Sequence, residues 1–294
     1  MTIYDCIVIG AGPGGLQAAI HLCRFRRRVL VVDGGGGRTR HARHIENFLG
    51  LELVTGGELI DTGLAQAARF GAEIVRAKVT AVEGGELFTV RTEHDRWQAR
   101  FVIASSGGRE ILPPLANLGR HFARSVHTCV DCDGYRVVGR QTLMIGSSLN
   151  SVRLAFGIRK MFTERVGVLA VGFTVPEDYR QLLEEDGITL HYGEPKSLRG
   201  EGDLEGVELA DGSFLPCEAI FLGFGMQLND GYLAGLHPDR DAEGYKILTH
   251  GAGETSVPNL FAVGALRPGH AQAVIAAGQG CAAAIEINGR LLGL

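Results

Sequence analysis

One stretch decides the fold of this chain: YDCIVIGAGPGG, residues 4–15. It begins as a short apolar, β-branched run that ends at glycine, which predicts a buried strand. Residues from Leu16 to Phe25 follow at helical spacing, and Val29 to Val32 predict a second strand that ends in Asp33. Strand, glycine turn, helix, strand and acid in this order predict a dinucleotide-binding βαβ unit.

Each glycine of the turn has a separate physical role in such a unit. Gly10 would make the tight turn, Gly12 would let the backbone approach a pyrophosphate, and Gly15 would let the helix pack on the strand. The acid after the second strand would bind a ribose hydroxyl. The residues that we expect at the ligand from this unit are Gly10, Gly12, Pro13, Gly14, Gly15, Asp33 and Gly34.

A basic segment, Arg38 to His44, leaves the nucleotide unit directly. It could be a solvated loop, or it could meet an anionic ligand or partner, and the sequence leaves both interpretations open. A helix is predicted from about Gly57 to Phe70. Three further strands would form a meander that closes this lobe: Glu73–Val82, Leu87–Thr92 and Arg100–Ala104.

A second α/β lobe is predicted to begin near the breaker Ile111-Leu112-Pro113-Pro114. It repeats the opening of the chain, with a strand at Gln141–Ile145, the turn GSSLNS at residues 146–151, and a helix over Val152–Met161. Only the first glycine of the turn is kept, and the next strand, Val166–Val171, leads to Gly-Phe with no acid or arginine. This loss of the binding residues argues against a nicotinamide cofactor in the second lobe.

The rest of the second lobe is predicted as one helix and three strands: Glu177–Asp186, Ile188–Tyr192, Leu204–Leu209 and Ala219–Gly223. The chain is then expected to return to the first lobe. Leu260 to Gly264 predicts a strand that reaches a turn, and Ala271 to Leu291 predicts a long helix. Gly264 and Gln272 are candidates for ligand contact at this turn.

The second lobe also carries HTCVDCDG, residues 127–134. A Cys-x-x-Cys pair at Cys129 and Cys132 is either a redox dithiol, half of a zinc site or chance. Asp133 stands where it could manage the proton of thiol chemistry, whereas a zinc site would need a second ligand pair that the sequence lacks. His127 would lower a thiol pKa if it were protonated nearby, but a packed or surface histidine is the ordinary expectation. The other cysteines lie in apolar surroundings and are expected to be buried thiols: Cys6, Cys23, Cys217 and Cys281.

Composition excludes several classes of protein. With 294 residues and 45% hydrophobic content, the chain can bury one large core or two ordinary ones. A net charge of −4 does not suggest a nucleic-acid binder. No run reaches the roughly 18 apolar residues of a membrane span, and no signal-peptide pattern opens the chain, so we expect a cytoplasmic protein.

Taken together, these features resemble the low-molecular-weight thioredoxin reductase family over nearly the whole length of the chain. Four segments carry the likeness: Glu46–Gly50, Cys129–Gly134, Thr255–Gly264 and Ala271–Val274. The resemblance implies an α/β fold of two nested dinucleotide-binding domains, each three-layered (ββα) and Rossmann-like. Residues 1–112 and 245–294 would bind FAD, and residues 113–244 would form an NADPH-domain-like lobe that carries the redox pair.

The same resemblance implies roles for individual residues. Cys132 would take electrons from the flavin, Cys129 would attack the substrate disulfide, and Asp133 would give and accept the proton. The substrate would be a thioredoxin-like protein or a small disulfide, and the protein would be a homodimer. Further FAD contacts are implied at Arg38, Asn47, Val79, Ala104, Gly264, Gln272 and Ala273.

Departures from the family pattern change the expected electron donor. Members that use NADPH keep the second glycine motif and a basic cluster, which this chain lacks. It therefore looks more like the pyridine-nucleotide-independent relatives (ferredoxin–flavin, deeply rooted and diflavin-linked reductases), so that ferredoxin or a second flavin would replace NADPH. Ala265 stands where the family has an aspartate at the ribityl chain, and Ser105-Ser106 replaces Thr-Gly.

Three alternatives stay open from the sequence. The first is an NAD(P)H-dependent thioredoxin reductase. The second is a dithiol oxidase on the same scaffold, which would oxidise a small dithiol and give electrons to oxygen. The third is a flavin-loaded sensor or binding protein whose contact surface is the basic region His41–His44.

Overall fold

The computed structural model describes residues 2–294 and divides them into two compact units. Unit 1 is formed by residues up to Arg109 and from Gln227 onward, and unit 2 by Glu110–Met226. The first crossing lies close to the predicted one. The chain returns to unit 1 at Gln227, earlier than the predicted residue 245, and the two connecting segments pair as short strands, β7 (Gly108–Glu110) and β16 (Met226–Leu228).

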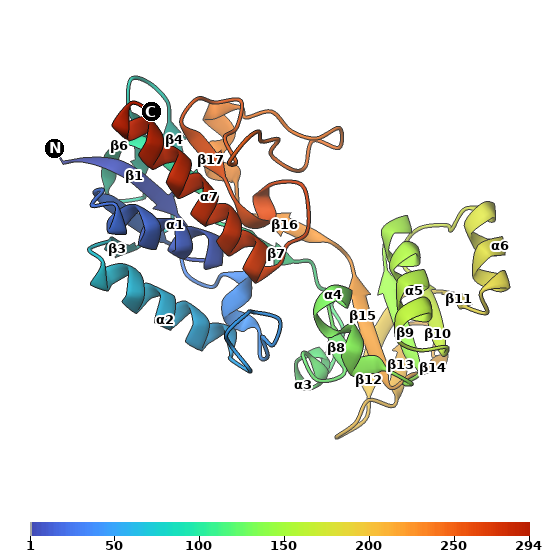
Figure 1. Cartoon of the computed structure of the whole chain (residues 1–294). Coiled ribbons are helices and arrows are strands. Elements are labelled where there is room, and N and C mark those ends of the chain that lie inside the picture. Colours follow the sequence, from blue (N-terminus) through green and yellow to red (C-terminus); the bar gives the residue numbers. More distant parts are fainter. Residues whose placement is uncertain (1) are drawn as a thin grey trace. The chain divides into compact units, whose positions relative to one another are not determined.

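Unit 1 is built on a seven-stranded sheet (Figure 1). Strands run in the order β3-β2-β1-β6-β5-β4, and β17 also pairs with β6. The pairs that involve β1, β2, β3 and β17 are parallel, and β4-β5-β6 are antiparallel. The strand bounds are β1 Ile3–Ile9, β2 Val29–Asp33, β3 Glu73–Arg76, β4 Ala81–Glu83, β5 Phe88–Arg91, β6 Arg96–Ala104 and β17 Leu260–Ala262.

The predicted meander needs correction at its first strand. Residues 73–82 form two strands, because β3 extends the parallel side beside β2 whereas β4 pairs with β5. The break between them, residues 77–80, carries the chain from one side of the sheet to the other. Only β4, β5 and β6 form the meander.

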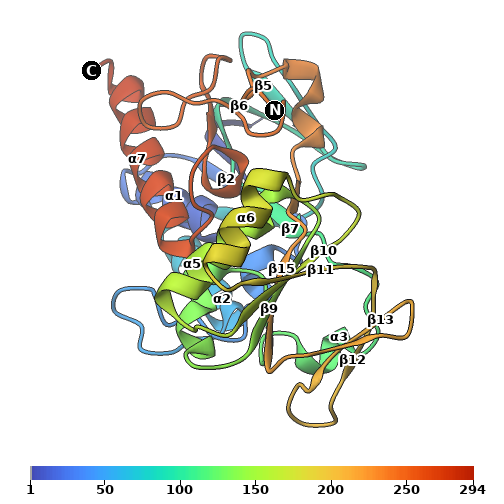
Figure 2. The ribbon, with the colours of Figure 1, turned by 90° about the vertical axis from the view of Figure 1, so that its right-hand side faces the viewer.

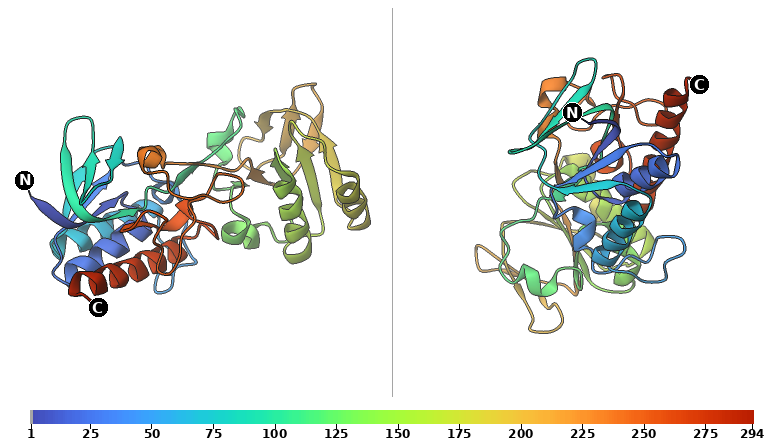
Figure 3. Two further views of the ribbon diagram at one scale, coloured as in Figure 1. Left: turned by 90° about the horizontal axis from the view of Figure 1, so that it is seen from above. Right: turned by 90° about the vertical axis from the view of Figure 1, so that its left-hand side faces the viewer.

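Helices cover one face of this sheet, and α1 packs between α2 and α7 (Figure 3, left). Apolar side chains from β1, β2, β6 and these three helices form one buried cluster. A second cluster on the opposite face includes residues of β4, β5 and the turn η3, so that the unit has three layers. The helical bounds are α1 Pro13–Arg24, α2 Gly56–Arg69, α7 Ala273–Leu292, η1 Arg38–His41, η3 Gly231–Leu236 and η4 Gly264–Leu266.

Unit 2 has a parallel five-stranded sheet of order β11-β10-β9-β15-β8 and an antiparallel three-stranded sheet of order β12-β13-β14. Figure 2 shows α5 and α6 on the near face of the strands β9–β11. One core cluster lies under α5 and α6, and another lies between the two sheets. The bounds are α3 Leu118–His121, β8 Val126–His127, α4 Val130–Asp133, η2 Gly134–Val137, β9 Thr142–Gly146, α5 Leu149–Met161, β10 Val166–Ala170, α6 Glu177–Glu185, β11 Thr189–Tyr192, β12 Pro195–Arg199, β13 Gly206–Leu209, β14 Phe214–Pro216 and β15 Ala219–Gly223.

Candidate redox and flavin site

A disulfide joins Cys129 and Cys132 in unit 2, with their Cα atoms 5.3 Å apart. Cys129 caps the start of α4 and is separated from the end of β8 by one residue, and both cysteines are half-buried. The backbone N–H of Cys132 lies 3.2 Å from Sγ of Cys129. This donor would stabilise negative charge on Cys129 once the disulfide opens.

Asp133 follows the disulfide and is fixed from three sides. Its N–H donates to the carbonyl oxygen of Cys129 at 3.1 Å. Its Oδ2 lies 3.4 Å from Nδ1 of His127, and its Oδ1 lies 3.4 Å from Nε of Arg136. The sequence placed Asp133 beside the dithiol, but it did not indicate the two basic neighbours of its carboxylate.

The glycine that closes the redox motif is required by packing. A Cβ at Gly134 would lie 2.2 Å from the ring of Phe162, which follows α5. A larger residue would therefore push the redox turn off this ring.

The other cysteines differ from the redox pair in burial. Cys6, Cys23 and Cys217 are buried. Loss of hydration raises the pKa of Cys23 to about 11 and of Cys217 to about 12, and it raises the pKa of Cys6 further. Cys281 is half-buried, with Sγ 3.3 Å from Nε2 of His21.

A cavity of about 950 Å³ opens in unit 1 at the turn between β1 and α1. Most of the residues that the sequence and the resemblance suggested for a dinucleotide line it: Gly10, Gly12, Pro13, Gly14, Asp33, Gly34, Arg38, Val79, Gly264, Gln272 and Ala273. Their elements are separate in sequence, and the parallel strands bring them to one edge of the sheet.

The glycines of the turn meet steric demands. Gly10 has φ +101°, and a Cβ there would lie 2.8 Å from the carbonyl oxygen of Ser105. A Cβ at Gly15 would lie 2.1 Å from the carbonyl oxygen of Gly10. Gly15 therefore lies beneath the turn and supports it from the helix side.

Asp33 reaches the cavity from the end of β2. Its Oδ1 accepts from the N–H of Ala11 at 3.1 Å, and its Oδ2 pairs with Nη1 of Arg76 at 3.1 Å. Such an acid orients the glycine turn as well as facing a ligand.

Three predicted ligand residues, Gly15, Asn47 and Ala104, lie outside the cavity lining. Ala104 is buried at the end of β6. Asn47 donates from Nδ2 to Oε1 of Gln272 at 2.9 Å, and thereby joins two segments that are far apart in sequence.

Several lining residues were missed by sequence reasoning: Lys78, Thr80, Asn229 and Tyr232. Ser106 Oγ donates to the carbonyl oxygen of Asn229 at 2.7 Å and lies 2.9 Å from the hydroxyl of Tyr232. Burial raises the pKa of Tyr232 above its ordinary value. Lys78 and Thr80 belong to the crossing that was predicted as continuous strand, so no local signal marked them.

These residues fit a dinucleotide such as FAD. Backbone at Gly36 and Gly37 has open space where a Cβ would stand, so a ligand can approach closely. Arg38 and Lys78 bring positive charge to the same cavity for a pyrophosphate. At Ala265 no carboxylate is present, and Nζ of Lys246 donates to its carbonyl oxygen at 2.5 Å.

The corresponding turn of unit 2 has different chemistry. Ser148 occupies the position that Gly12 has in unit 1, and Ser151 Oγ donates to the carbonyl oxygen of Ser148 at 2.6 Å. The strand β10 ends at Ala170, and the next helix begins with two carboxylates, Glu177 and Asp178.

Comparison with known proteins identifies the scaffold. Residues 4–280 match the family described as pyridine nucleotide-disulphide oxidoreductase. The chain belongs to this thioredoxin reductase-like family. As a member, it is a flavin-dependent disulfide oxidoreductase.

Relatives match along their length. The thioredoxin reductase of Mycolicibacterium smegmatis is 30% identical over 97% of this chain and 96% of its own. That of Streptomyces coelicolor is 29% identical over 97% and 92%. The crystal structure of HlmI is 34% identical, with a TM-score of 0.91 over 99% of this chain and 93% of HlmI.

The predicted α/β fold with Rossmann-like sheets is confirmed. A thioredoxin reductase from Streptococcus pyogenes, only 23% identical, superposes with a TM-score of 0.91 over 99% of both chains. Within residues 2–294, no helix has the length and apolarity to cross a membrane. In the same part of the chain, no group of three His, Cys, Asp or Glu residues is arranged to hold a metal ion.

Proposed function

We propose that this oxidoreductase moves electrons between bound FAD and the Cys129–Cys132 disulfide, and on to the disulfide of a thioredoxin-like protein or small molecule, without direct reduction by NADPH. One observation carries the proposal. A redox disulfide stands in a chain whose dinucleotide turn is complete in unit 1 and altered in unit 2.

The exchange balances with the residues present. FAD, when bound, supplies a two-electron carrier. Opening the disulfide takes two electrons and two protons and yields two thiols. Cys129, as thiolate, attacks the substrate disulfide and releases one substrate thiolate, and Cys132 then attacks the Cys129 sulfur and releases the second. Asp133, next to the pair, is placed to give and take protons.

The donor proposed here is not NADPH for two physical reasons. Ser148 adds a side chain where a bare backbone would meet the pyrophosphate. Glu177 and Asp178 lie in the first turn of α6, in the segment that follows β10, where a 2′-phosphate would need positive charge. Reduced ferredoxin or a second bound flavin is the class of donor that would supply the electrons instead.

Stopped-flow absorbance tests this exclusion of NADPH. We expect the flavin of the purified holoprotein to stay oxidised when mixed anaerobically with micromolar NADPH or NADH, and to be reduced by a chemical reductant such as dithionite. A Cys129→Ser variant controls for the disulfide, because it should keep its flavin content and lose disulfide turnover. Fast flavin reduction at low micromolar NADPH would contradict the proposal.

The altered turn of unit 2 also favours a second candidate, a dithiol oxidase. A small dithiol would lose two electrons and two protons to become a disulfide, and oxygen would take both to become hydrogen peroxide. In air, the holoprotein with a small dithiol would then release peroxide. Peroxide release, with no reduction of a thioredoxin disulfide by dithionite-reduced protein, would favour the oxidase direction.

A further inference from the structure

A histidine lies buried beside the redox pair of unit 2. His127 ends β8, and its side chain is 2% exposed. The register of β8 with β15 sets His127 opposite Phe221, and the centroids of the two rings lie 5.4 Å apart. The imidazole is therefore held between an apolar ring and the turn that carries the cysteines.

The carboxylate of Asp133 faces Nδ1 of His127. Nδ1 of His127 lies 3.4 Å from Oδ2 of Asp133 and has no closer hydrogen bond within residues 2–294. A buried polar atom that lacks a hydrogen bond costs about 1–3 kcal/mol. Attraction to the carboxylate offsets this cost most when the imidazole carries a proton.

Two elements bring charged groups to this part of unit 2. Asp133, at the end of α4, faces the imidazole, and Arg136 of η2 approaches the other oxygen of that carboxylate. The strand β15 contributes the apolar ring of Phe221. The carboxylate of Asp133 therefore contacts two basic side chains, one at each oxygen.

This arrangement matters when the disulfide opens. Two protons are taken up for every two electrons if both sulfurs become thiols, and a proton must reach the pair from a group that carries one at neutral pH. A carboxyl group ordinarily loses its proton near pH 4, whereas an imidazole titrates near pH 6.5. An imidazole in contact with the carboxylate next to the pair can therefore supply such a proton.

We propose that His127 is a positioning residue and proton store for the dithiol, which holds the carboxylate of Asp133 and exchanges a proton with it as Cys129 and Cys132 open and close. The inference rests on the proposed function only in that this pair is the one that opens. It does not depend on the electron donor or on the substrate.

Thiol alkylation tests the proposal on the full-length holoprotein. After reduction with excess tris(carboxyethyl)phosphine, the rate at which iodoacetamide labels Cys129 and Cys132 is followed by mass spectrometry from pH 5 to 9. The native profile should show two ionisations, one from the histidine and one from a thiol. His127→Gln should lose the first, with labelling at pH 6.5 slower by up to about tenfold.

The matched control is His121→Gln. His121 is a buried histidine of the same unit, and its Nε2 bonds to the carbonyl oxygen of Gly200. This variant should keep the native two-step profile. A folded His127→Gln protein with the native profile would overturn the proposal.

A measurement on the native chain covers the case in which His127→Gln does not fold. The imidazole resonances of the histidines are titrated by NMR in the oxidised and in the reduced protein. We expect the titration midpoint of His127 to move between the two states and that of His121 to stay. An unmoved His127 midpoint would overturn the proposal, and neither readout changes if NADPH proves to be the donor.

Discussion

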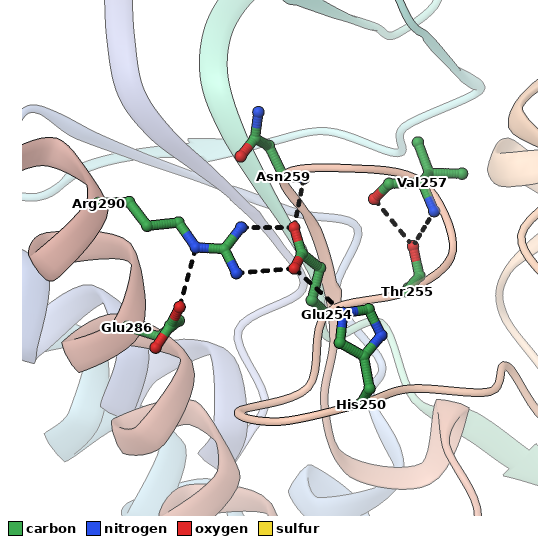
Figure 4. Close-up of polar contacts among 7 residues, drawn as sticks. All are labelled: His250, Glu254, Thr255, Val257, Asn259, Glu286 and Arg290. Atoms are coloured by element: carbon green, nitrogen blue, oxygen red, sulfur yellow. Dashed lines mark hydrogen bonds and ion pairs between the residues drawn. The ribbon is translucent and has the colours of Figure 1, made fainter. Parts of the chain in front are cut away.

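Glu254 is a buried carboxylate held by three neighbours (Figure 4). Arg290 of α7 donates to its two oxygens at 2.6 and 2.7 Å, the N–H of Asn259 donates at 2.8 Å, and His250 lies 3.3 Å away. The hydrogen bonds from Arg290, more than any other cause, lower the pKa of Glu254 from 4.5 to about 2. The pair ties the segment before β17 to the last turns of α7.

Replacing Glu254 by Gln should lower the free energy of unfolding at pH 7 by about 2–3 kcal/mol. The folded-state pKa lies below the unfolded value, so the contribution is complete above pH 4.5 and is lost as the pH falls through 2. Urea unfolding at pH 7, 5 and 3 should therefore show the difference between native and variant protein shrinking at the lowest pH.

Glu286→Gln is the control for this variant. Glu286 accepts from Nε of the same arginine at 2.9 Å, but its side chain is 44% exposed. Its loss should cost about 0–1 kcal/mol. A Glu254→Gln difference that stayed constant between pH 7 and 3 would contradict the ionic account.

At the redox turn, the sequence predicted the residues that are adjacent in the chain. Cys129, Cys132 and Asp133 form a Cys-x-x-Cys-Asp pattern, which can be recognised from the sequence alone. Arg136 contacts the carboxylate of Asp133 from three residues further along the chain. An arginine at this spacing is common on helix surfaces, so it did not mark the site. The role of His127 depends on the pairing of β8 with β15, which joins residues about ninety positions apart and leaves no local pattern.

Helices α1 and α7 of unit 1 pack closely where a glycine of each helix lies at the contact. A Cβ at Gly280 of α7 would lie 1.9 Å from the carbonyl oxygen of Gly14 in α1. This contact lets α7 approach the turn of the flavin cavity, to which its N-cap residue Gln272 and its first residue Ala273 contribute. The packing of one helix therefore sets the position of cavity residues.

Gly280→Ala should push α7 away from α1 and lower the free energy of unfolding by about 1–3 kcal/mol, with weaker flavin retention. Gly278→Ala on the same helix has open space around the new methyl group and should stabilise the protein by up to about 1 kcal/mol. Thermal unfolding and the flavin-to-protein absorbance ratio measure both effects. Equal behaviour of the two variants would show that the close contact does not limit packing.

Strands that are continuous apolar runs were predicted well, whereas strands with few apolar residues were not. The strands β1, β2 and β15 are apolar throughout their middle and were predicted within a residue or two. The strand β12 reads PKSLR and buries only Leu198, so nothing in its composition marks it as a strand. Its pairing with β13, rather than its own propensity, stabilises it.

At the scale of the whole molecule, unit 2 is one continuous segment inserted into unit 1. Each unit has its own buried clusters, two in unit 1 and two in unit 2. Arg109 and Gln227 are the residues of unit 1 that flank this insertion. Nε of Arg109 donates to Oε1 of Gln227 at 2.9 Å, so the two flanking residues lie next to each other. The return at Gln227 was placed too late from sequence, because the pairing of β16 with β7 has no local signal.

Replacing residues 110–226 by a short glycine-rich linker should leave a folded protein that binds one FAD per chain, because the whole cavity lining belongs to unit 1. Flavin extraction gives the ratio for the shortened and the complete chain. Two flavins in the complete chain and one in the shortened chain would place a second flavin in unit 2. A folded but flavin-free shortened protein would contradict the assignment of FAD to unit 1.

The burial of Cys6, Cys23 and Cys217 has a consequence for the fidelity of electron delivery. A disulfide that opens and closes on every cycle can exchange with other thiols of the same chain, because a nearby thiolate can attack one sulfur of the pair and form the wrong disulfide. Because burial keeps these three sulfurs protonated at neutral pH, they are poor nucleophiles and cannot intercept the exchange. These three cysteines therefore do not compete with the substrate disulfide for the reducing equivalents of the dithiol.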